Sequence, residues 1–254
     1  MHLADVIARV GSRDRRLILR DPLLLLLCAV ALGSSLALRW ALVAIDLSLT
    51  ARGVMPTEPG GLRFRDTYGL WIGYFALWNS ALLPGTVFAF LHVGEKEDGT
   101  LLAIRVTPIP PRLYLLSRVL LPYLLALAFS GLTFVLLREF TPHSIVQLVP
   151  LILGSALSAP VVTILLAAWA DDKVQGFALT KFAGVLGLLI IATWFMPPPW
   201  RAVANALPPI ALIDAYWGIE ADGSIASASL AWGLVGQCLL LGLALRQFQE
   251  QLRA

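Results

Sequence analysis

The residues that could support chemistry in this sequence are few, and they lie at the edges of long apolar stretches. Two acids are adjacent, Asp171 and Asp172, and a second group of charges lies in the segment 92–118. Adjacent carboxylates can help to hold a divalent metal, but a metal cage needs several more oxygen ligands. Lys173 follows the pair directly. A membrane-embedded, metal-dependent transferase that uses Asp171 and Asp172 is therefore the minor alternative.

The other reactive residue types do not combine into a known catalytic arrangement. The three histidines, His2, His92 and His143, are scattered at the edges of apolar runs. Cys28 and Cys238 each lie inside such a run, where a cysteine packs as a small hydrophobic residue. The sequence contains no GxxxxGK[ST], HExxH or GxSxG motif. We therefore expect no catalytic residue and no metal site, and we do not expect the chain to be an enzyme.

The elements that position these residues are long and apolar. The chain has 254 residues, of which 58% are hydrophobic and 14% charged, against about 25% charged in soluble domains. Its mean hydropathy is +0.80. Six runs reach the roughly 20 apolar residues that cross a bilayer as a helix, and their apolar residues do not alternate with the period of a membrane barrel. We expect an all-α membrane protein with spans at about 22–45, 67–91, 117–137, 145–169, 174–195 and 224–245.

The distribution of basic residues predicts the orientation. Because the number of spans is even, both termini lie on the same side of the membrane, together with the segment 92–118. Most of the basic residues outside the spans lie on this side, so the positive-inside rule predicts that it is the cytoplasmic side. The net charge of +3 reflects this topology and gives no reason to expect a nucleic-acid partner. Residues 1–21 have the pattern of a basic amphipathic helix that lies on membrane lipid. A cleaved signal peptide is less consistent with so long a charged start, and we treat residues 1–254 as one domain of a plasma-membrane protein.

Three polar residues inside the spans are candidates for a translocation path: Arg39, Asn79 and Ser80. Arg39 lies near the outer edge of the first span, so it either extends towards the headgroups or faces a polar cavity between subunits. Asn79 and Ser80 precede Pro84 and Gly85, and this combination is expected to loosen or kink the second span.

The segment 195–218 combines tryptophan and tyrosine with two proline clusters. Such a composition favours the outer membrane interface. We expect a re-entrant or interfacial pair of short helices there, before the last span.

In the charged segment 92–118, "EKED" at residues 95–98 ends the second span. Gly99 and Thr100 can break and restart the chain, and Thr100 is a suitable N-cap for a short helix. The following "LLAIRV" gives little more than one apolar turn before "TPIPP" stops it. A small apolar helix held in this way is suited to dock into a groove on a partner protein.

The stretch "GEKEDGTLLAIRVTPIPPRLYLLSRVL" resembles the signature of ABC-2-type transporter permeases, in which E-x-E-x-G-T-L and a following T-P link the second and third spans. The matching residues are Glu95, Glu97, Gly99, Thr100, Leu101, Thr107 and Pro108. Leu102 departs from the pattern, because the family often has an acid there. Residues 13–22, 171–184 and 207–218 also resemble the corresponding parts of these permeases.

This resemblance implies a six-span permease subunit of an ATP-binding-cassette exporter. The chain would pair with a second copy or a sister permease and would sit on cytoplasmic ATPase subunits, which bind the ATP and magnesium. It would hold no cofactor itself. The segment 92–118 would contain the coupling helix, with Glu95, Glu97, Gly99 and Thr100 shaping the bend and Leu101, Leu102 and Ile104 seated in the ATPase.

The cargo is less well defined by the sequence. The sparse charge in the spans favours a hydrophobic or amphipathic substrate over an inorganic ion. In its overall sequence, although in no single motif, the chain resembles small drug-export permeases, including those for fluoroquinolone efflux. Lipid and lipid-linked sugars stay open as substrates, and a structural membrane-anchor subunit stays open as a role.

Overall fold

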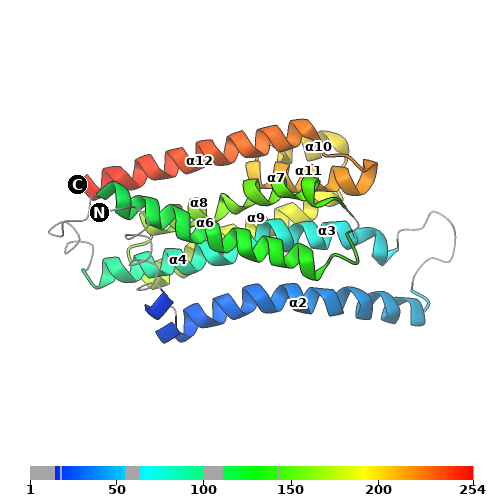
Figure 1. The fold of residues 1–254 in the computed structure, drawn as a ribbon, viewed down its shortest axis with the longest axis horizontal. Coiled ribbons are helices and arrows are strands. Elements are labelled where there is room, and N and C mark those ends of the chain that lie inside the picture. The colour runs from blue at the N-terminus through cyan, green and yellow to red at the C-terminus, as the bar shows by residue number, and fades with distance from the viewer. Residues whose placement is uncertain (1–14, 18, 55–62, 100–110, 142, 254) are drawn as a thin grey trace.

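The computed structural model describes residues 15–17, 19–54, 63–99, 111–141 and 143–253, and its elements are all helical. Figure 1 shows them as an elongated bundle. The elements in chain order are α2 (Pro22–Ala51), η1 (Phe64–Thr67), α3 (Tyr68–Gly73), η2 (Tyr74–Asn79), α4 (Ser80–Glu97), α6 (Pro111–Leu136), α7 (Ile145–Ala156), α8 (Ser158–Trp169), α9 (Lys173–Trp194), α10 (Pro198–Ala204), α11 (Pro208–Asp222) and α12 (Ser227–Arg253).

The six expected spans are confirmed. Six helical stretches of the described chain are long and apolar enough to cross a membrane: Pro22–Ala51, Phe64–Glu97, Leu115–Leu136, Ile145–Trp169, Lys173–Trp194 and Ser227–Phe248. The second stretch joins η1, α3, η2 and α4, and the fourth joins α7 and α8. The chain is therefore an all-α, multi-pass membrane protein.

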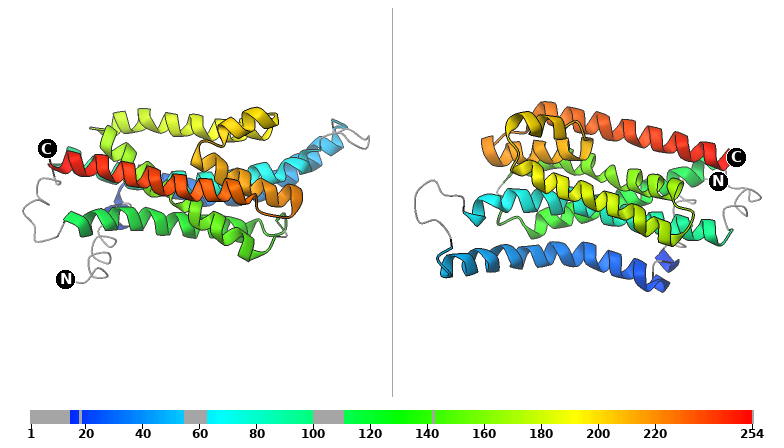
Figure 2. Two further views of the ribbon diagram at one scale, coloured as in Figure 1. Left: turned by 90° about the horizontal axis from the view of Figure 1, so that it is seen from above. Right: turned by 180° about the vertical axis from the view of Figure 1, so that it is seen from behind.

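The second and fourth spans form the centre of the bundle. Each is 72% buried over its most apolar window, whereas the other four spans are 22% to 28% buried. Figure 2 shows α2 and α9 on the outside of the bundle. Because the peripheral helices expose many large apolar side chains, including Trp40, Phe182 and Leu243, their outer faces are suited to contact with lipid or with another membrane subunit.

The start of α2 and the end of α12 lie at the same end of the bundle, beside the end of α4 (Figure 1). We call this the charged end, because residues 95–99 and 171–173 lie there. Two expected features fall largely or wholly outside the described residues: the interfacial helix at 1–21, of which only its last turn is described, and the short helix after Thr100. Both stay predictions.

The pair of short helices expected in segment 195–218 is present as α10 and α11. The two helices differ in burial, because α10 has no buried residue while α11 buries Leu212, Tyr216 and Trp217 to 2% exposure or less. Glycines of α12 permit this close packing. A Cβ atom on Gly236 would lie 2.4 Å from Cγ of Pro208. The second short helix is thus part of the core.

The two central spans approach closely at Gly85 of α4. A Cβ atom at this position would lie 2.7 Å from the carbonyl oxygen of Ala159 on α8. The carbonyl oxygen of Gly85 also accepts a hydrogen bond from Thr163 Oγ1 at 3.0 Å. Only glycine fits this contact without moving one backbone relative to the other.

We therefore expect Gly85→Ala to lower the free energy of unfolding by about 1–3 kcal/mol, the usual cost of overpacking. Thermal unfolding in detergent measures the effect. Gly184→Ala is the matched control, because a Cβ at Gly184 meets nothing within 4 Å, and alanine favours the helix there. Equal unfolding temperatures for the two variants would contradict the contact between α4 and α8.

Candidate functional site at the charged end

Glu95 is buried between α4 and α6. Its Oε1 accepts a hydrogen bond from Arg118 Nη2 at 2.5 Å, and its Oε2 lies 3.6 Å from Nδ1 of His92. The side chains of Glu95 and Arg118 are only 4% and 2% exposed. Charges removed from solvent to this degree need a close partner, so this ion pair fixes the end of the second span against the start of the third.

Lys96 connects the same end of α4 to α8. Its Nζ donates to the carbonyl oxygens of Ala167 at 3.1 Å and Ala170 at 2.8 Å. It also lies 3.3 Å from Oδ1 of Asp171. The last carbonyls of a helix have no partner within the helix and carry its negative dipole end. The ammonium group of Lys96 therefore caps α8.

Glu97 reaches the start of α9, where its Oε1 accepts a hydrogen bond from the backbone N–H of Lys173 at 2.8 Å. Asp172 caps the same helix by accepting from the backbone N–H of Gln175 at 2.7 Å. The Lys173 ammonium in turn lies 3.7 Å from Asp21, which caps α2. Three consecutive residues of α4, from Glu95 to Glu97, thus contact three different helices: α6, α8 and α9.

Gly99 ends this stretch with a left-handed backbone, at φ +66°. Its N–H donates to the carbonyl oxygen of Lys96 at 3.0 Å. A left-handed residue directly after a helix is the usual place for glycine, and the expected break of the chain at Gly99 is found. The other residues expected to carry coupling lie outside the described residues: Thr100, Leu101, Leu102, Ile104, Thr107 and Pro108.

Sequence reasoning missed the partners of these residues. Arg118 and Lys96 are among the basic residues whose distribution predicted the orientation, but their contacts with Glu95 and with the end of α8 were not expected. The available signal was the position of Arg118 at the edge of an apolar run, because a charge at such an edge either reaches solvent or has a partner.

Asp171 and Asp172, the residues of the transferase alternative, are both engaged in the same network. Asp171 lies beside Lys96, and Asp172 caps α9. Among the described residues, no three His, Cys, Asp or Glu side chains come close enough together to hold a metal ion. The geometry gives these two acids structural contacts that explain their presence.

Arg39, one of the three translocation-path candidates, lies towards the opposite end of the bundle. Its Nε is 3.1 Å from Oε1 of Glu139, and its Nη1 lies 3.4 Å from the carbonyl oxygen of Leu136. The two charged side chains are 40% and 51% exposed. Arg39 therefore links α2 to the end of α6 in a partly exposed ion pair.

Asn79 and Ser80 belong to a polar cluster between α2, α4 and α6. Asn79 Nδ2 donates to Ser34 Oγ at 3.1 Å, while Ser80 Oγ lies 3.2 Å from Thr133 Oγ1, which is 2.7 Å from Ser35 Oγ. The structure therefore brings Asn79 and Ser80 together, while Arg39 lies elsewhere. Each of the three side chains has a partner within the protein.

The expected loosening of the second span is found in the same place. Residues Tyr74–Asn79 form a π-helix, and Ser80 Oγ donates to the carbonyl oxygen of Phe75 at 2.8 Å. A π-helix widens the turn and is frequent at functional sites. The carbonyl oxygen of Phe75 thus accepts both the backbone N–H and the hydroxyl of Ser80, which reinforces the irregular turn.

Comparison with known proteins adds the family. Residues 14–245 match the sequence model described as "Fluoroquinolones export permease protein Rv2686c-like". The chain is 28% identical over 249 residues to the "Fluoroquinolones export permease protein Rv2686c" of Mycobacterium tuberculosis strain ATCC 25618 / H37Rv, covering 96% of this chain and 94% of that protein. The same values hold for the protein MT2760 of strain CDC 1551 / Oshkosh. No solved structure matches the chain.

Proposed function

This chain belongs to the family of Rv2686c-like fluoroquinolones export permease proteins, and from that premise we propose that it is the membrane permease subunit of an ATP-binding-cassette exporter. Its six spans and almost uncharged interior suit the passage of a hydrophobic or amphipathic molecule. The names of its relatives make fluoroquinolones the first drug class to test.

The energy source in this proposal is a separate ATPase subunit that binds ATP and magnesium. The charged end then faces the cytoplasm of a plasma-membrane protein, with both termini on that side, and the permease pairs with a second copy or a sister chain. The residues that would meet the ATPase are Leu101, Leu102 and Ile104, between the bend at Gly99–Thr100 and the stop at Thr107–Pro108.

The observation that carries the proposal is the set of contacts made by Glu95, Lys96 and Glu97. These residues directly precede the proposed coupling segment, and they contact α6, α8 and α9. A displacement of the segment would therefore be delivered through α4 to these three helices at once. Packed elements with discrete contacts of this kind are the physical means by which motion passes between sites.

We expect Leu101→Asp to uncouple the permease from its ATPase. A charged side chain cannot be buried in an apolar groove without a partner, so substrate-stimulated ATP hydrolysis should fall at least about fivefold, the lower range of typical coupling free energies. Glu97→Ala should reduce it in the same direction by freeing the start of α9. The measurement is ATPase activity of the co-purified complex in lipid nanodiscs.

Asp222→Ala is the control, because Asp222 is exposed at the end of α11, far along the chain from the charged end. It should leave the activity unchanged. If the chain purified without an ATPase subunit, the permease proposal would fail. A membrane-anchor subunit would instead bind its partner and show no dependence of ATP hydrolysis on Leu101.

A further inference from the structure

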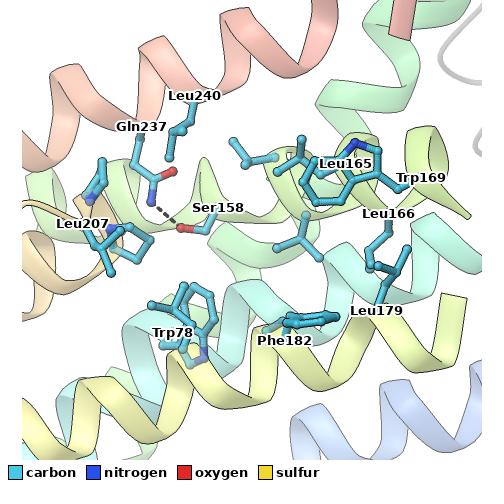
Figure 3. Close-up of a pocket in the computed structure, with 16 residues that line it drawn as sticks. Trp78, Ser158, Leu165, Leu166, Trp169, Leu179, Phe182, Leu207, Gln237 and Leu240 are labelled. Atoms are coloured by element: carbon cyan, nitrogen blue, oxygen red, sulfur yellow. Dashed lines mark hydrogen bonds between the residues drawn. The ribbon is translucent and has the colours of Figure 1, made fainter. Parts of the chain in front are cut away.

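A cleft of about 410 Å³ lies between α9 and α12, with α8 as its floor (Figure 3). This volume falls within the roughly 300–1,000 Å³ of small-molecule sites. Aromatic side chains line it at three places, Trp78, Trp169 and Phe182. Phe182 and Trp169 are 72% and 54% exposed, so the cleft is open along the apolar surface of the bundle.

Two residues of this apolar lining have a buried polar atom without a hydrogen-bond partner among the described residues, Trp78 at Nε1 and Gln237 at Oε1. The indole nitrogen of Trp78 lies close to Gly187 of α9. Gln237 of α12 is fully buried, and its Nε2 donates to Ser158 Oγ of α8 at 2.6 Å. Among the described residues, none donates a hydrogen bond to its Oε1. Figure 3 shows this oxygen turned away from Ser158, towards the side of the cleft where Leu165 lies. A buried acceptor without a donor is unfavourable until a donor reaches it.

We propose that this cleft binds an aromatic amphiphile whose single hydrogen-bond donor, a hydroxyl or N–H group, reaches Oε1 of Gln237. The flat ring system would lie between Phe182 on α9 and Leu240 on α12, over the apolar floor formed by α8. The molecule would enter laterally from the bilayer, because the exposed wall of the cleft lies on the apolar outer surface of the bundle.

Two other occupants fit these observations less well. A lipid acyl chain fills apolar space but carries no donor, so it leaves the Gln237 oxygen unsatisfied. A second copy of this chain would have to insert a donor-bearing side chain into the cleft. Most of the exposed large side chains of α9 are apolar, namely Val174, Phe177, Phe182, Val185 and Leu188, and the exposed donors Gln175 and Lys181 lie within its first nine residues. The amide therefore favours a small donor-bearing ligand.

That the bound molecule is also the transported molecule rests on the proposed function. The binding itself does not, since it depends only on the cleft and on Gln237. The two statements can accordingly be tested apart.

The test uses a pair of probes that differ in one donor, 1-hydroxypyrene and 1-methoxypyrene. The full chain is placed in lipid nanodiscs, and each probe is titrated while quenching of tryptophan emission is followed. Discs without protein correct for partition into lipid. Three variants accompany the wild type: Gln237→Leu removes the acceptor, Ala183→Phe fills the cleft from α9, and Val185→Phe adds the same ring to α9 outside the cleft lining.

We expect saturable binding of 1-hydroxypyrene about tenfold tighter than that of 1-methoxypyrene, the ratio typical of one buried hydrogen bond. Gln237→Leu should abolish this preference while retaining both probes. Ala183→Phe should remove saturable binding, and Val185→Phe should leave it intact.

Equal affinity for the two probes, or a preference that survives Gln237→Leu, would overturn the proposal and make the cleft an acyl-chain groove. Absence of saturable binding to the wild type would overturn it as well, as expected if a second copy covers the cleft. Saturable, Gln237-dependent binding without ATP-driven release of 1-hydroxypyrene from proteoliposomes of the complete transporter would support the site and contradict its role in transport.

Discussion

Glu95→Ala is expected to lower the free energy of unfolding by about 3–5 kcal/mol, the cost of breaking a buried ion pair by removing one partner. The carboxylate of Glu95 accepts from Arg118 at 2.5 Å, and the two side chains are almost fully buried. The variant leaves the guanidinium of Arg118 at the same depth without this carboxylate. Thermal unfolding in detergent and the yield of folded protein from membranes should both fall sharply.

The double variant Glu95→Leu/Arg118→Met separates the loss of the pair from a general intolerance of substitution. Replacing a buried ion pair by apolar residues of similar volume is often neutral, so the double variant should be more stable than Glu95→Ala. In the proposed exporter, its coupling of ATP hydrolysis to transport should nevertheless fall, because the directional contact between α4 and α6 is gone. A double variant no more stable than Glu95→Ala would show that the pair is not the main contribution of these residues.

The six spans could be predicted from the sequence because each is an apolar run long enough to satisfy its own backbone as a helix. The predicted bounds differ from those found mainly where a helix extends past the apolar run. The first span, for example, continues from the expected residue 45 to Ala51, and its last turn is stabilised by a hydrogen bond of the Thr50 hydroxyl to the Asp46 carbonyl oxygen. Local hydrogen bonds of this kind leave little trace in hydropathy.

The contacts between spans were not predictable in the same way. Hydropathy shows that a helix is apolar all round but not which helix it packs against, so neither the central position of the second and fourth spans nor the burial of α11 followed from it. The same holds for Glu95, which was expected to shape the bend before the coupling segment, because its pairing with Arg118 could not be read from hydropathy. No sequence pattern marks Gln237, because it is a single amide in a 27-residue helix and the cleft beside it is formed by residues distant in the sequence.

Lys96→Met should lower the free energy of unfolding by about 3 kcal/mol or more. A hydrogen bond of a charged donor contributes about 1.5–3 kcal/mol, and Lys96 donates two of them to the carbonyl oxygens at the end of α8. Methionine retains most of the apolar stem and removes only the ammonium group. The loss should be concentrated at the turn between α8 and α9, and faster hydrogen exchange over residues 167–176 is the local measurement of it.

Lys173→Met is the matched control for this prediction. Lys173 lies at the same end of the bundle, but its ammonium is 3.7 Å from Asp21 and its side chain is 43% exposed. An exposed pair at this distance contributes about 0–1 kcal/mol. The two variants are therefore compared by the decrease in their free energy of unfolding. If Lys96→Met lowered it no more than Lys173→Met, the second span would not be held to α8 through the ammonium group of Lys96. A clear excess for Lys96→Met, accompanied by a fall in substrate-stimulated ATP hydrolysis, would identify the α8–α9 turn as one of the places to which motion of the coupling segment is delivered.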